Sequence, residues 1–438
     1  MGARKMAYRS WLSAVLISLV GLSLGCNELA STWLGTPPIP TPTAPSQGPI
    51  PSPSPSPTVP PPIVSATPMT LTVWTAVEFA PTGEALARQL EEFEAISLKV
   101  HVAIQPKGME GKGGLVNLMT AAAPVAPSVL PDVAIVNSAQ AAALAQQGLI
   151  HPWQDLLPPN LEEDLFPLAR RLGYYEEQRM GVSVALDLQH LAYNLNEVPT
   201  PPLLWRDVLT GKALYLFPAM GKGDTLDTFL IQYLGAGGRL FDEEGSPLLE
   251  GEPLAAALAR YQGAEIVRVV PSEALQLDSL AACWPLYLSG RVGMVHVWAS
   301  RYLAEQSKLQ HTSFAPIPTV GETRITVGRG WLMVLVAKDP VRQEKAARFL
   351  SWWLAPQYNA ALCRATGWLP PGHAAFAQWQ GDDRYYRFLQ GQLEVALPQP
   401  ILSPPWAEAL SGAIGQVLRG EVTAQEAAAQ VMAVVSLH

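Results

Sequence analysis

Residues Gly181–Asn194 read Gly-Val-Ser-Val-Ala-Leu-Asp-Leu-Gln-His-Leu-Ala-Tyr-Asn, and the predicted fold depends on this stretch. Val182, Val184 and Leu186 alternate with residues small enough to be covered, which is typical of a strand buried on most sides. Asp187 stands in the middle, and a buried acid is costly unless another group pairs with it. Such a strand, followed by a second apolar run, indicates a chain that leaves one domain for another at the edge of a ligand crevice. An ordinary core strand with a capped acid is the alternative.

The length and composition favour a two-part globular body with an acidic surface. The 438 residues are too many for one core and suit two lobes with appendages. Hydrophobic residues make up 49% and charged residues only 15%, so a sizeable core can be buried. The formal net charge of -8 argues against nucleic acid or an anionic membrane surface as the partner.

Sequence motifs for metal binding and catalysis are missing. The histidines show no His-Glu-x-x-His or other metal spacing, and there is neither a Gly-x-Ser-x-Gly motif nor a phosphate loop. We therefore expect no metal, no cofactor and no catalytic residue. The cysteines form no Cys-x-x-Cys motif. Cys283 and Cys363 could be linked in an oxidising compartment, but two small buried thiols are the preferred interpretation.

The N-terminus has the pattern of a secretory signal peptide over residues 1–25. Basic residues open the chain, and an apolar run over 11–24, too short to span a membrane comfortably, ends at Gly25. Residues 22–26, Leu-Ser-Leu-Gly-Cys, resemble the lipobox of bacterial lipoproteins, which implies that Cys26 is acylated and becomes the mature N-terminus. The lipobox prefers an aliphatic residue where this chain has Ser23, so an uncleaved anchor and plain secretion are the alternatives. All three place the remaining chain outside the cytoplasm.

Residues 26–68 are interpreted as a tether. From residue 36 onward they are dominated by Pro, Ser and Thr, and 51–57 read Pro-Ser-Pro-Ser-Pro-Ser-Pro. Such a segment cannot bury a core and stays extended as a semi-rigid spacer. At about 3.1 Å per residue it reaches on the order of 100 Å, enough to hold a globular body off a membrane. A ligand for a proline-recognition domain is the alternative.

The globular body begins with alternating strands and helices. Strands are predicted at 69–75, 98–104 and 131–136. Helices are predicted after a cap at Thr82, after the glycine-rich loop 108–114, and from a Ser138 cap to Gly148. This alternation predicts a parallel sheet covered on both faces. Ligands gather at the carboxyl ends of such strands, which here are residues 75–78 and 137–138.

Several motifs, taken in order with Gly181–Asn194, resemble the extracytoplasmic solute-binding proteins of ATP-binding-cassette importers, in the large maltose-binding-protein-like class. They are Ser-Gly-Arg-Val-Gly-Met at 289–294, Phe-Ala-Pro-Ile-Pro-Thr at 314–319, Thr-Gly-Trp-Leu-Pro at 366–370 and Arg-Gly-Glu-Val-Thr-Ala-Gln-Glu at 419–426. The likeness extends from residue 69 to the C-terminus. Independently, Thr423 and Glu426 form the pattern of a capping box before an alanine-rich helix.

The resemblance implies a two-lobe α/β fold of type II, each lobe a mostly parallel sheet flanked by helices. Lobe I would comprise residues 69–184 and 319–367, and lobe II residues 188–314 and 368–438. Hinge crossings are expected near 182–188, 315–319 and 366–370, with the ligand held between the closing lobes. The residue pattern alone supports only two α/β halves.

Tryptophans at the ends of predicted strands and helices are candidate ligand contacts. Indole faces offer apolar area to the C–H faces of a sugar ring. The candidates are Trp74, Trp298, Trp331, Trp368 and Trp406. Trp406 lies in the first turn of a helix capped by Ser403 and matches a stacking tryptophan of the family. A core side chain is the alternative for each. The tryptophans at 352, 353 and 379 fall in helical patterns and are assigned to the core.

Acids, amides and hydroxyls near these rings are the candidate hydrogen-bonding groups. They are Glu78, Asn137, Ser138, Asp187, Asp224 and Thr225. The resemblance matches Glu78 and Asp187 to acidic sugar contacts and places Asp224 and Thr225 at a helix start facing the cleft. For Asp224 a plain helix cap is the alternative. The family's aromatic residue after the third strand is replaced by Val136-Asn137, which argues against a linear glucan and does not exclude a smaller glycoside or monosaccharide.

The expected function is therefore a monomeric, lipid-anchored receptor that binds a carbohydrate and delivers it to the permease of an importer. An extracellular glycoside-processing lipoprotein is one alternative, with Glu78 and Asp187 as its acid and nucleophile. A ligand-sensing subunit of a signalling receptor, which would share the fold, is another.

Overall fold

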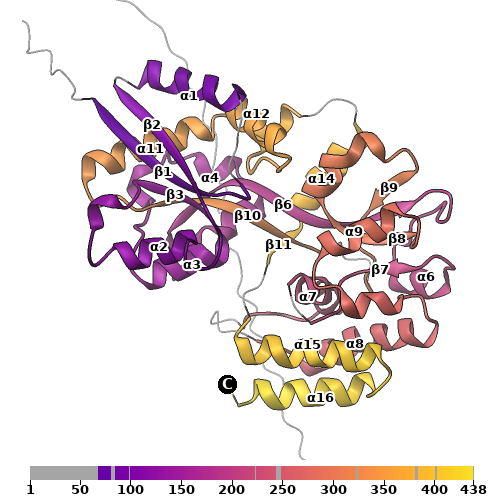
Figure 1. Ribbon diagram of the computed structural model, residues 1–438. Coiled ribbons are helices and arrows are strands. Elements are labelled where there is room, and N and C mark those ends of the chain that lie inside the picture. Colours follow the sequence, from indigo (N-terminus) through magenta and orange to yellow (C-terminus); the bar gives the residue numbers. More distant parts are fainter. Residues whose placement is uncertain are drawn as a thin grey trace, which may run out of the picture. The chain divides into compact units, whose positions relative to one another are not determined.

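The computed structural model describes residues 68–79, 84–97, 99–221, 223–242, 248–321, 324–379, 383–399 and 402–437 (Figure 1). The predicted signal peptide, Cys26, Thr82 and all but the last residue of the tether lie outside the described residues. Within the described ranges, none of the helices has the length and apolar character that crossing a membrane requires.

The first half of the body is the predicted run of parallel strands. Strands β1 (Met69–Ala76), β2 (Val100–Lys107) and β3 (Val133–Asn137) lie in the order β2-β1-β3, and both pairs are parallel. Helices α1 (Glu84–Ile96), α2 (Leu115–Ala122) and α3 (Ser138–Gln146) follow them in turn. The three predicted strands are thus confirmed.

The predicted cap of α3 is wrong by one residue. Asn137 is the cap, because its side-chain oxygen accepts a hydrogen bond from Gln140 N at 2.8 Å and its own N–H donates to Gln140 Oε1 at 3.2 Å. Ser138 is the first helical residue instead. Glutamine at the third helical position completes this capping box and selects the preceding asparagine.

Strand β6 (Gly181–Asn194) runs from the first half of the sheet into the second. Residues 181–188 of β6, apart from Val184, pair with β10 (Thr326–Leu335), and its later residues pair with β8 (Met294–Trp298) and β9 (Thr312–Ala315). Every residue of β6 except the last is buried. The prediction of a buried strand that passes between two halves is confirmed.

The expected predominance of parallel pairs does not extend to the second half. Only β7 (Tyr215–Leu216) is parallel to β8, whereas β8 and β9 are antiparallel to β6. β10 is antiparallel to both β3 and β6. The physical reason is that β6 and β10 carry the chain between the halves in opposite directions and lie side by side.

Two further segments lie against these crossing strands. Leu369, in the predicted third crossing, exchanges two backbone hydrogen bonds of 2.7 and 2.8 Å with Leu186 of β6. Strand β11 (Ala396–Pro398), which the sequence did not predict, pairs with the start of β10. Among the described residues, the main sheet has nine strands, in the order β2-β1-β3-β10-β6-β8-β7 with β9 and β11 attached at the sides.

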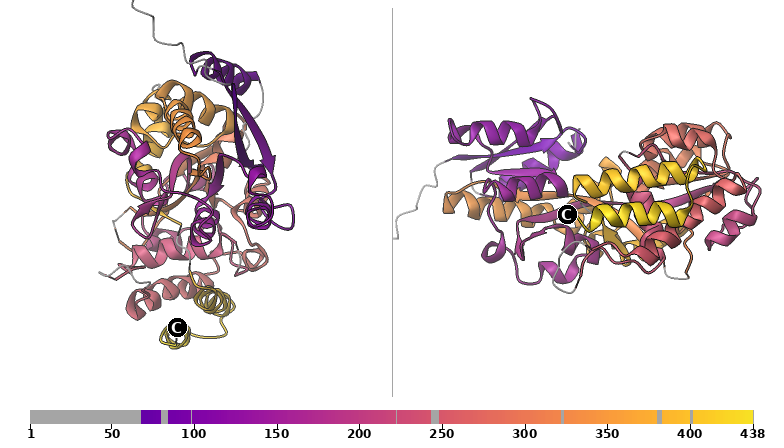
Figure 2. Two further views of the ribbon diagram at one scale, coloured as in Figure 1. Left: turned by 90° about the vertical axis from the view of Figure 1, so that its left-hand side faces the viewer. Right: turned by 90° about the horizontal axis from the view of Figure 1, so that it is seen from below.

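The remaining elements cover this sheet. They are α4 (Leu161–Asp164), α5 (Pro167–Leu172), β4 (Tyr174–Tyr175), β5 (Gln178–Arg179), α6 (Trp205–Thr210), α7 (Thr225–Gly235), α8 (Gly251–Ile266), α9 (Leu280–Leu288), α10 (Ala299–Glu305), α11 (Pro340–Trp353), α12 (Pro356–Thr366), α13 (His373–Ala377), α14 (Arg384–Leu393), α15 (Pro404–Leu418) and α16 (Ala424–Val435). The last two helices lie side by side, seen in yellow in Figure 2, and both pack against α8.

The capping predictions for these two helices have different outcomes. The capping box of Thr423 and Glu426 is present at the start of α16. Ser403 occupies the cap position of α15, but its side chain makes no capping hydrogen bond. The proline that follows Ser403 supplies no N–H and lowers the need for one.

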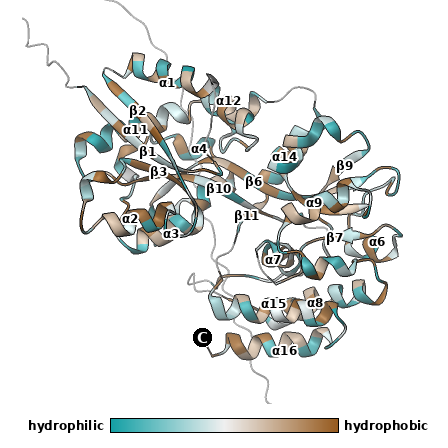
Figure 3. Cartoon of the chain, viewed as in Figure 1, coloured by the Kyte–Doolittle hydropathy of each residue, from teal (hydrophilic) through white to brown (hydrophobic). Residues whose placement is uncertain are grey.

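The core follows the hydrophobic pattern of the sequence. Much of β6 is brown in the hydropathy colouring of Figure 3, in keeping with its burial. Trp352, Trp353 and Trp379 are buried, as predicted. Cys283 and Cys363 are both buried and unlinked, which confirms the preferred interpretation, and burial raises the pKa of both thiols.

Candidate ligand-binding site

A cavity of about 520 Å³ lies at the carboxyl ends of β1 and β3, where the sequence predicted that ligands gather. Its lining residues are Glu78, Met109, Asn137, Ser138, Ala139, Arg329, Gly330, Trp331, Trp368 and Gln399. Five of the predicted candidates are therefore brought together from separate stretches of the chain. They are Glu78, Asn137, Ser138, Trp331 and Trp368.

Two of the lining residues form an aromatic corner. The ring centroids of Trp331 and Trp368 are 5.6 Å apart with an interplanar angle of 85°. The ring centroid of Phe79 lies 5.4 Å from that of Trp331 and 6.4 Å from that of Trp368. Trp331 is buried and Trp368 is half-buried, so Trp368 is the more accessible ring. Because the three rings hold one another, Trp368 offers an apolar face without having to be ordered on binding.

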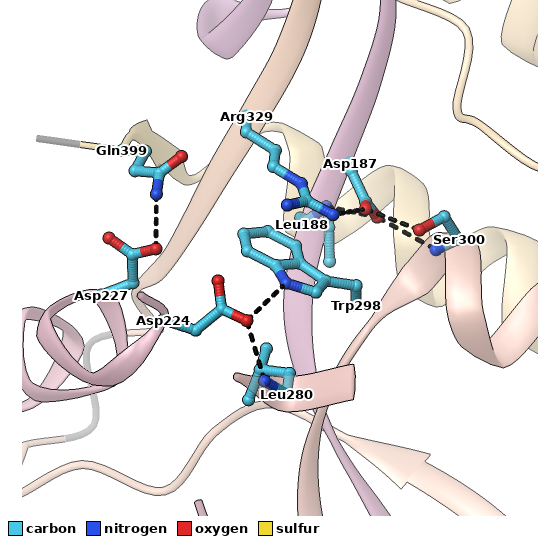
Figure 4. Close-up of polar contacts among 9 residues, drawn as sticks. All are labelled: Asp187, Leu188, Asp224, Asp227, Leu280, Trp298, Ser300, Arg329 and Gln399. Atoms are coloured by element: carbon cyan, nitrogen blue, oxygen red, sulfur yellow. Dashed lines mark hydrogen bonds and ion pairs between the residues drawn. The ribbon is translucent and has the colours of Figure 1, made fainter. Parts of the chain in front are cut away.

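Arg329 is a cavity residue that the sequence analysis missed. It belongs to β10, and its Nη2 lies 3.2 Å from Asp187 Oδ2. Its Cζ lies 3.9 Å from the ring centroid of Trp298, a cation–π contact seen in Figure 4. The same Cζ lies 5.6 Å from the ring centroid of Trp368, a second cation–π contact. The side chain of Arg329 is 37% exposed, whereas that of Asp187 is 0% exposed. Arg329 thus forms the cavity wall and Asp187 lies behind it.

Both carboxylate oxygens of Asp187 accept hydrogen bonds from other groups of the protein. Its Oδ1 accepts from Leu188 N and from Ser300 N, each at 3.0 Å. Its Oδ2 accepts from Ser300 Oγ at 2.7 Å and from Arg329. Burial raises the pKa of Asp187, while Arg329 and Ser300 act in the opposite direction. The buried acid therefore has the charged partner that the sequence analysis expected, Arg329. This geometry suits a residue that positions Arg329 and does not itself contact a ligand.

Trp298 and Asp224 support Arg329 from the other side. Trp298 is buried but belongs to neither hydrophobic cluster of the described residues, because Arg329 covers one face of its ring. Its Nε1 donates to Asp224 Oδ2 at 3.4 Å, and the same oxygen accepts from Leu280 N at 2.8 Å (Figure 4). Asp224 makes no capping bond to its own helix α7, so the plain-cap alternative is wrong. Thr225 is buried, and its hydroxyl accepts from Gly221 N.

Asp227 is a second group that the sequence analysis missed. It is buried in the first turn of α7, and Gln399 Nε2 donates to its Oδ2 at 2.6 Å. Burial raises the pKa of Asp227 to about 8, nearby Asp224 adds to the rise, and Arg329 opposes it. Asp227 is therefore mainly protonated at neutral pH and fixes the amide of Gln399, which lines the cavity. The spacing of Asp224 and Asp227 at a helix start was the available signal.

Two of the predicted aromatic candidates lie elsewhere. Trp74 and Trp406 are both buried in the main hydrophobic cluster, with exposed fractions of 6% and 7%, and neither is a lining residue of the cavity. Lys107 Nζ lies 4.7 Å from the ring centroid of Trp74. Among the described residues, no three His, Cys, Asp or Glu side chains are grouped so that they could hold a metal ion.

Comparison with known proteins decides the family. Residues 89–383, more than half of the chain, match the model of a family described as bacterial extracellular solute-binding protein. The chain belongs to this family. Its members are extracellular, so this solute-binding protein acts outside the cytoplasm. No curated protein matches the sequence at a significant level.

Solved structures share the fold of this solute-binding protein. The cyclic alpha-maltosyl-1,6-maltose binding protein from Arthrobacter globiformis is 18% identical, with a TM-score of 0.70 over 85% of this chain and 99% of that one. The GacH receptor of Streptomyces glaucescens is 20% identical, with a TM-score of 0.65 over 85% and 98%. The maltose-binding periplasmic protein MalE from Listeria monocytogenes is 16% identical, with a TM-score of 0.66 over 84% and 97%. These similarities establish the two-lobe α/β fold.

Proposed function

We propose that this solute-binding protein is the receptor of an ATP-binding-cassette importer, and that it binds a carbohydrate between its two lobes and delivers it to a permease. The observation that carries the proposal is the cavity itself, in which an exposed indole face stands among hydrogen-bonding side chains. The similar solved structures support it, since they are described as complexes with maltose or acarbose or as a maltosyl-maltose binding protein.

The size and chemistry of the cavity suit a small neutral sugar. A volume of about 520 Å³ falls within the range of small-molecule sites, roughly 300–1,000 Å³. Trp368 would stack on the sugar ring, and Glu78, Asn137, Ser138 and Gln399 would bind its hydroxyls. Arg329 is already paired with Asp187, so its charge is offset and a free anion gains little there. A neutral hydroxyl can still accept from its exposed N–H groups.

We also propose that the protein is a binding protein without hydrolytic activity. A glycoside hydrolase of the common kind needs two carboxyl groups that face the substrate. Asp187 is fully buried, and its oxygens accept from Leu188, Ser300 and Arg329. Glu78 is then left without the partner that the enzyme alternative requires.

The proposed mechanism is closure about the crossing segments. Lobe I would contain about residues 69–184 and 319–367, and lobe II about 188–314 and 368–438, so that the cavity draws Glu78 from one lobe and Gln399 from the other. A ligand that touches both lobes binds the closed form more tightly and shifts the population toward it. The closed form then docks on the permease.

Substitution of Trp368 by alanine should weaken sugar binding about 10-fold or more, because it removes the accessible indole face at the cost of on the order of 1–2 kcal/mol of binding energy. A thermal-shift screen of mono- and disaccharides, maltose included, identifies the ligand, and calorimetry measures its affinity. Trp406→Ala is the matched control: it should lower the thermal midpoint and leave affinity nearly unchanged. Unaltered binding by Trp368→Ala would contradict the proposal, and a binding loss confined to Trp406→Ala would support the contact implied by the resemblance.

We further propose that acylated Cys26 anchors the protein to the membrane. Cys26→Ser should move the protein from the membrane fraction to the soluble extracytoplasmic fraction, because serine cannot carry the acyl anchor that residues 22–26 indicate. Cell fractionation with immunoblotting measures this. Cys283→Ser, which changes a buried thiol, should stay with the membrane. Membrane retention of Cys26→Ser would show that the lipid anchor is absent or dispensable.

A further inference from the structure

A second cavity, of about 810 Å³, adjoins the first. Ser138 and Gln399 line both cavities, so the two are neighbours that share these residues. The second cavity extends from there between the segment after α5 and the segment after α7, and β11 contributes Leu397 and Pro398 to its wall. Like the first cavity, it is lined by residues from both proposed lobes, for example Leu172 from lobe I and Leu240 from lobe II.

The walls of the second cavity are mainly carbon. Aliphatic and aromatic side chains predominate, among them Leu172, Tyr175, Met180, Leu240, Phe241 and Leu397. Arg171 and Arg239 also line this cavity, and Arg239 is paired with Glu250. The first cavity differs, because there the indoles alternate with an arginine, an acid, two amides and a hydroxyl. The second cavity is thus the more apolar of the two, and Ser138 and Gln399 are the residues that both share.

Phe241 distinguishes this cavity from a packing defect. Its neighbour Leu240 packs against the hydrophobic core, but Phe241 does not, and 55% of its surface is exposed. Its exposed ring therefore adds apolar area to the rim of a concave, mainly apolar surface. Tyr174, at the same cavity, is also exposed, and Arg179 lies over its ring at 4.3 Å.

We propose that the two cavities form one site for an amphipathic glycoside, with the sugar in the first cavity and an apolar aglycone, aryl or alkyl, in the second. This rests on the proposed sugar-binding function. A second sugar ring fits the second cavity less well, because its hydroxyls would lose water and meet mostly carbon. The glycosidic oxygen would lie near Ser138 and Gln399, whose amide is held by Asp227.

Calorimetry on matched glycosides tests this proposal. For each of D-glucose, D-galactose and D-xylose, the methyl and the phenyl glycoside are compared on the full chain. For the sugar that binds, the phenyl glycoside should bind about 10-fold or more tightly than the methyl glycoside, because its ring buries apolar area in the second cavity. Phe241→Ala should reduce this ratio several-fold and leave the affinity for the methyl glycoside unchanged. Ile266→Ala, an exposed apolar residue at the end of α8, should change neither.

The outcomes separate this inference from the proposed function. Equal affinity for methyl and phenyl glycosides, or a ratio that Phe241→Ala does not alter, overturns the amphipathic ligand and leaves sugar binding in place. A different result would also overturn the inference: maltotriose binds more tightly than maltose by as large a factor as the phenyl glycoside over the methyl glycoside, and Phe241→Ala removes that difference. The second cavity would then bind a sugar ring. If no glycoside, maltose or maltotriose binds, both proposals fail.

Discussion

Asp187→Ala should lower the free energy of unfolding by about 2–4 kcal/mol, because buried donors left without an acceptor cost about 1–3 kcal/mol each and the 37% exposed Arg329 adds little. In the native protein this carboxylate accepts from two backbone N–H groups, the Ser300 hydroxyl and the Arg329 guanidinium. Alanine leaves Ser300 N and Leu188 N buried beside a space that has no acceptor, and unpaired buried donors are expensive. The desolvation that raises the pKa of Asp187 disappears with the side chain, so the loss arises from these donors and from Arg329.

Urea unfolding monitored by fluorescence measures the effect. Asp187→Asn is the matched control, because its amide oxygen still accepts from Leu188 N and Ser300 N, whereas its amide nitrogen replaces the oxygen that accepts from Ser300 Oγ and Arg329. The asparagine variant should therefore lose clearly less stability than the alanine variant but should bind sugar more weakly, since Arg329 is no longer held against Trp298. A change of about 0.5 kcal/mol or less for Asp187→Ala, typical of surface sites, would show that this acid does not hold the crossing together.

Stability should also fall steeply as the pH drops below about 6.5, the ordinary pKa of histidine. His190 on β6 and His296 on β8 are fully buried, and burial lowers their pKa values to about 4 and about 3. Each ring contacts a tyrosine hydroxyl, that of Tyr385 at 2.8 Å for His190 and that of Tyr215 for His296. Between pH 6.5 and about 4 both histidines are protonated in the unfolded chain but stay neutral in the folded protein. Each histidine then costs about 1.4 kcal/mol of stability per pH unit.

Asp227 acts with the opposite sign. Its pKa in the folded protein is raised to about 8, so the stability it contributes is complete only below the ordinary pKa of an aspartate and is lost as the pH rises through about 8. In the acid range it therefore offsets part of the loss from the histidines. Asp227→Asn, which keeps an acceptor for Gln399, should flatten the alkaline side and steepen the acid side of the stability profile.

Thermal unfolding from pH 4.5 to 9 measures both limbs. The double variant His190→Gln, His296→Gln stays neutral throughout, so its midpoint should depend less on pH below 6.5 than that of the wild type, whatever its absolute stability. An acid limb equally steep in the double variant would assign the effect to other groups. The comparison uses the slope and not the midpoint, so a variant that is simply less stable remains informative.

Sequence patterns predicted the crossing strand and the ends of β1 and β3 because local rules govern both. Alternation revealed β6, and the position after a parallel strand located Glu78 and Asn137 at the cavity. Sequence patterns did not identify Arg329 as a site residue, because a lone arginine between two glycines belongs to no recognisable local pattern. Its importance comes from Asp187, which lies 142 residues earlier in the chain. Pairings over that distance become visible only once β6 and β10 lie side by side.

The same distinction explains the errors at Asp224 and Ser138. Both positions fit a helix cap by residue type, and at Asp224 the tertiary neighbours Leu280 and Trp298 take the carboxylate instead. At Ser138 the competing cap is the adjacent Asn137, which the glutamine three residues later favours. Residue type thus indicated a polar role at each helix start but could not specify the partner.

The pairing of β6 with β10 sets the kind of motion that the protein can make. Two strands joined by a ladder of backbone hydrogen bonds bend together as a ribbon, whereas a single linker would let the halves rotate independently. The shift of register between Trp331 and Leu332 is where we expect that bend in the proposed closure, because such an irregularity interrupts the ladder and bends the strand locally. Opening and closing should then follow one rotation axis near Trp331, so that a change of angle at this point moves the indole corner together with the wall that carries Arg329.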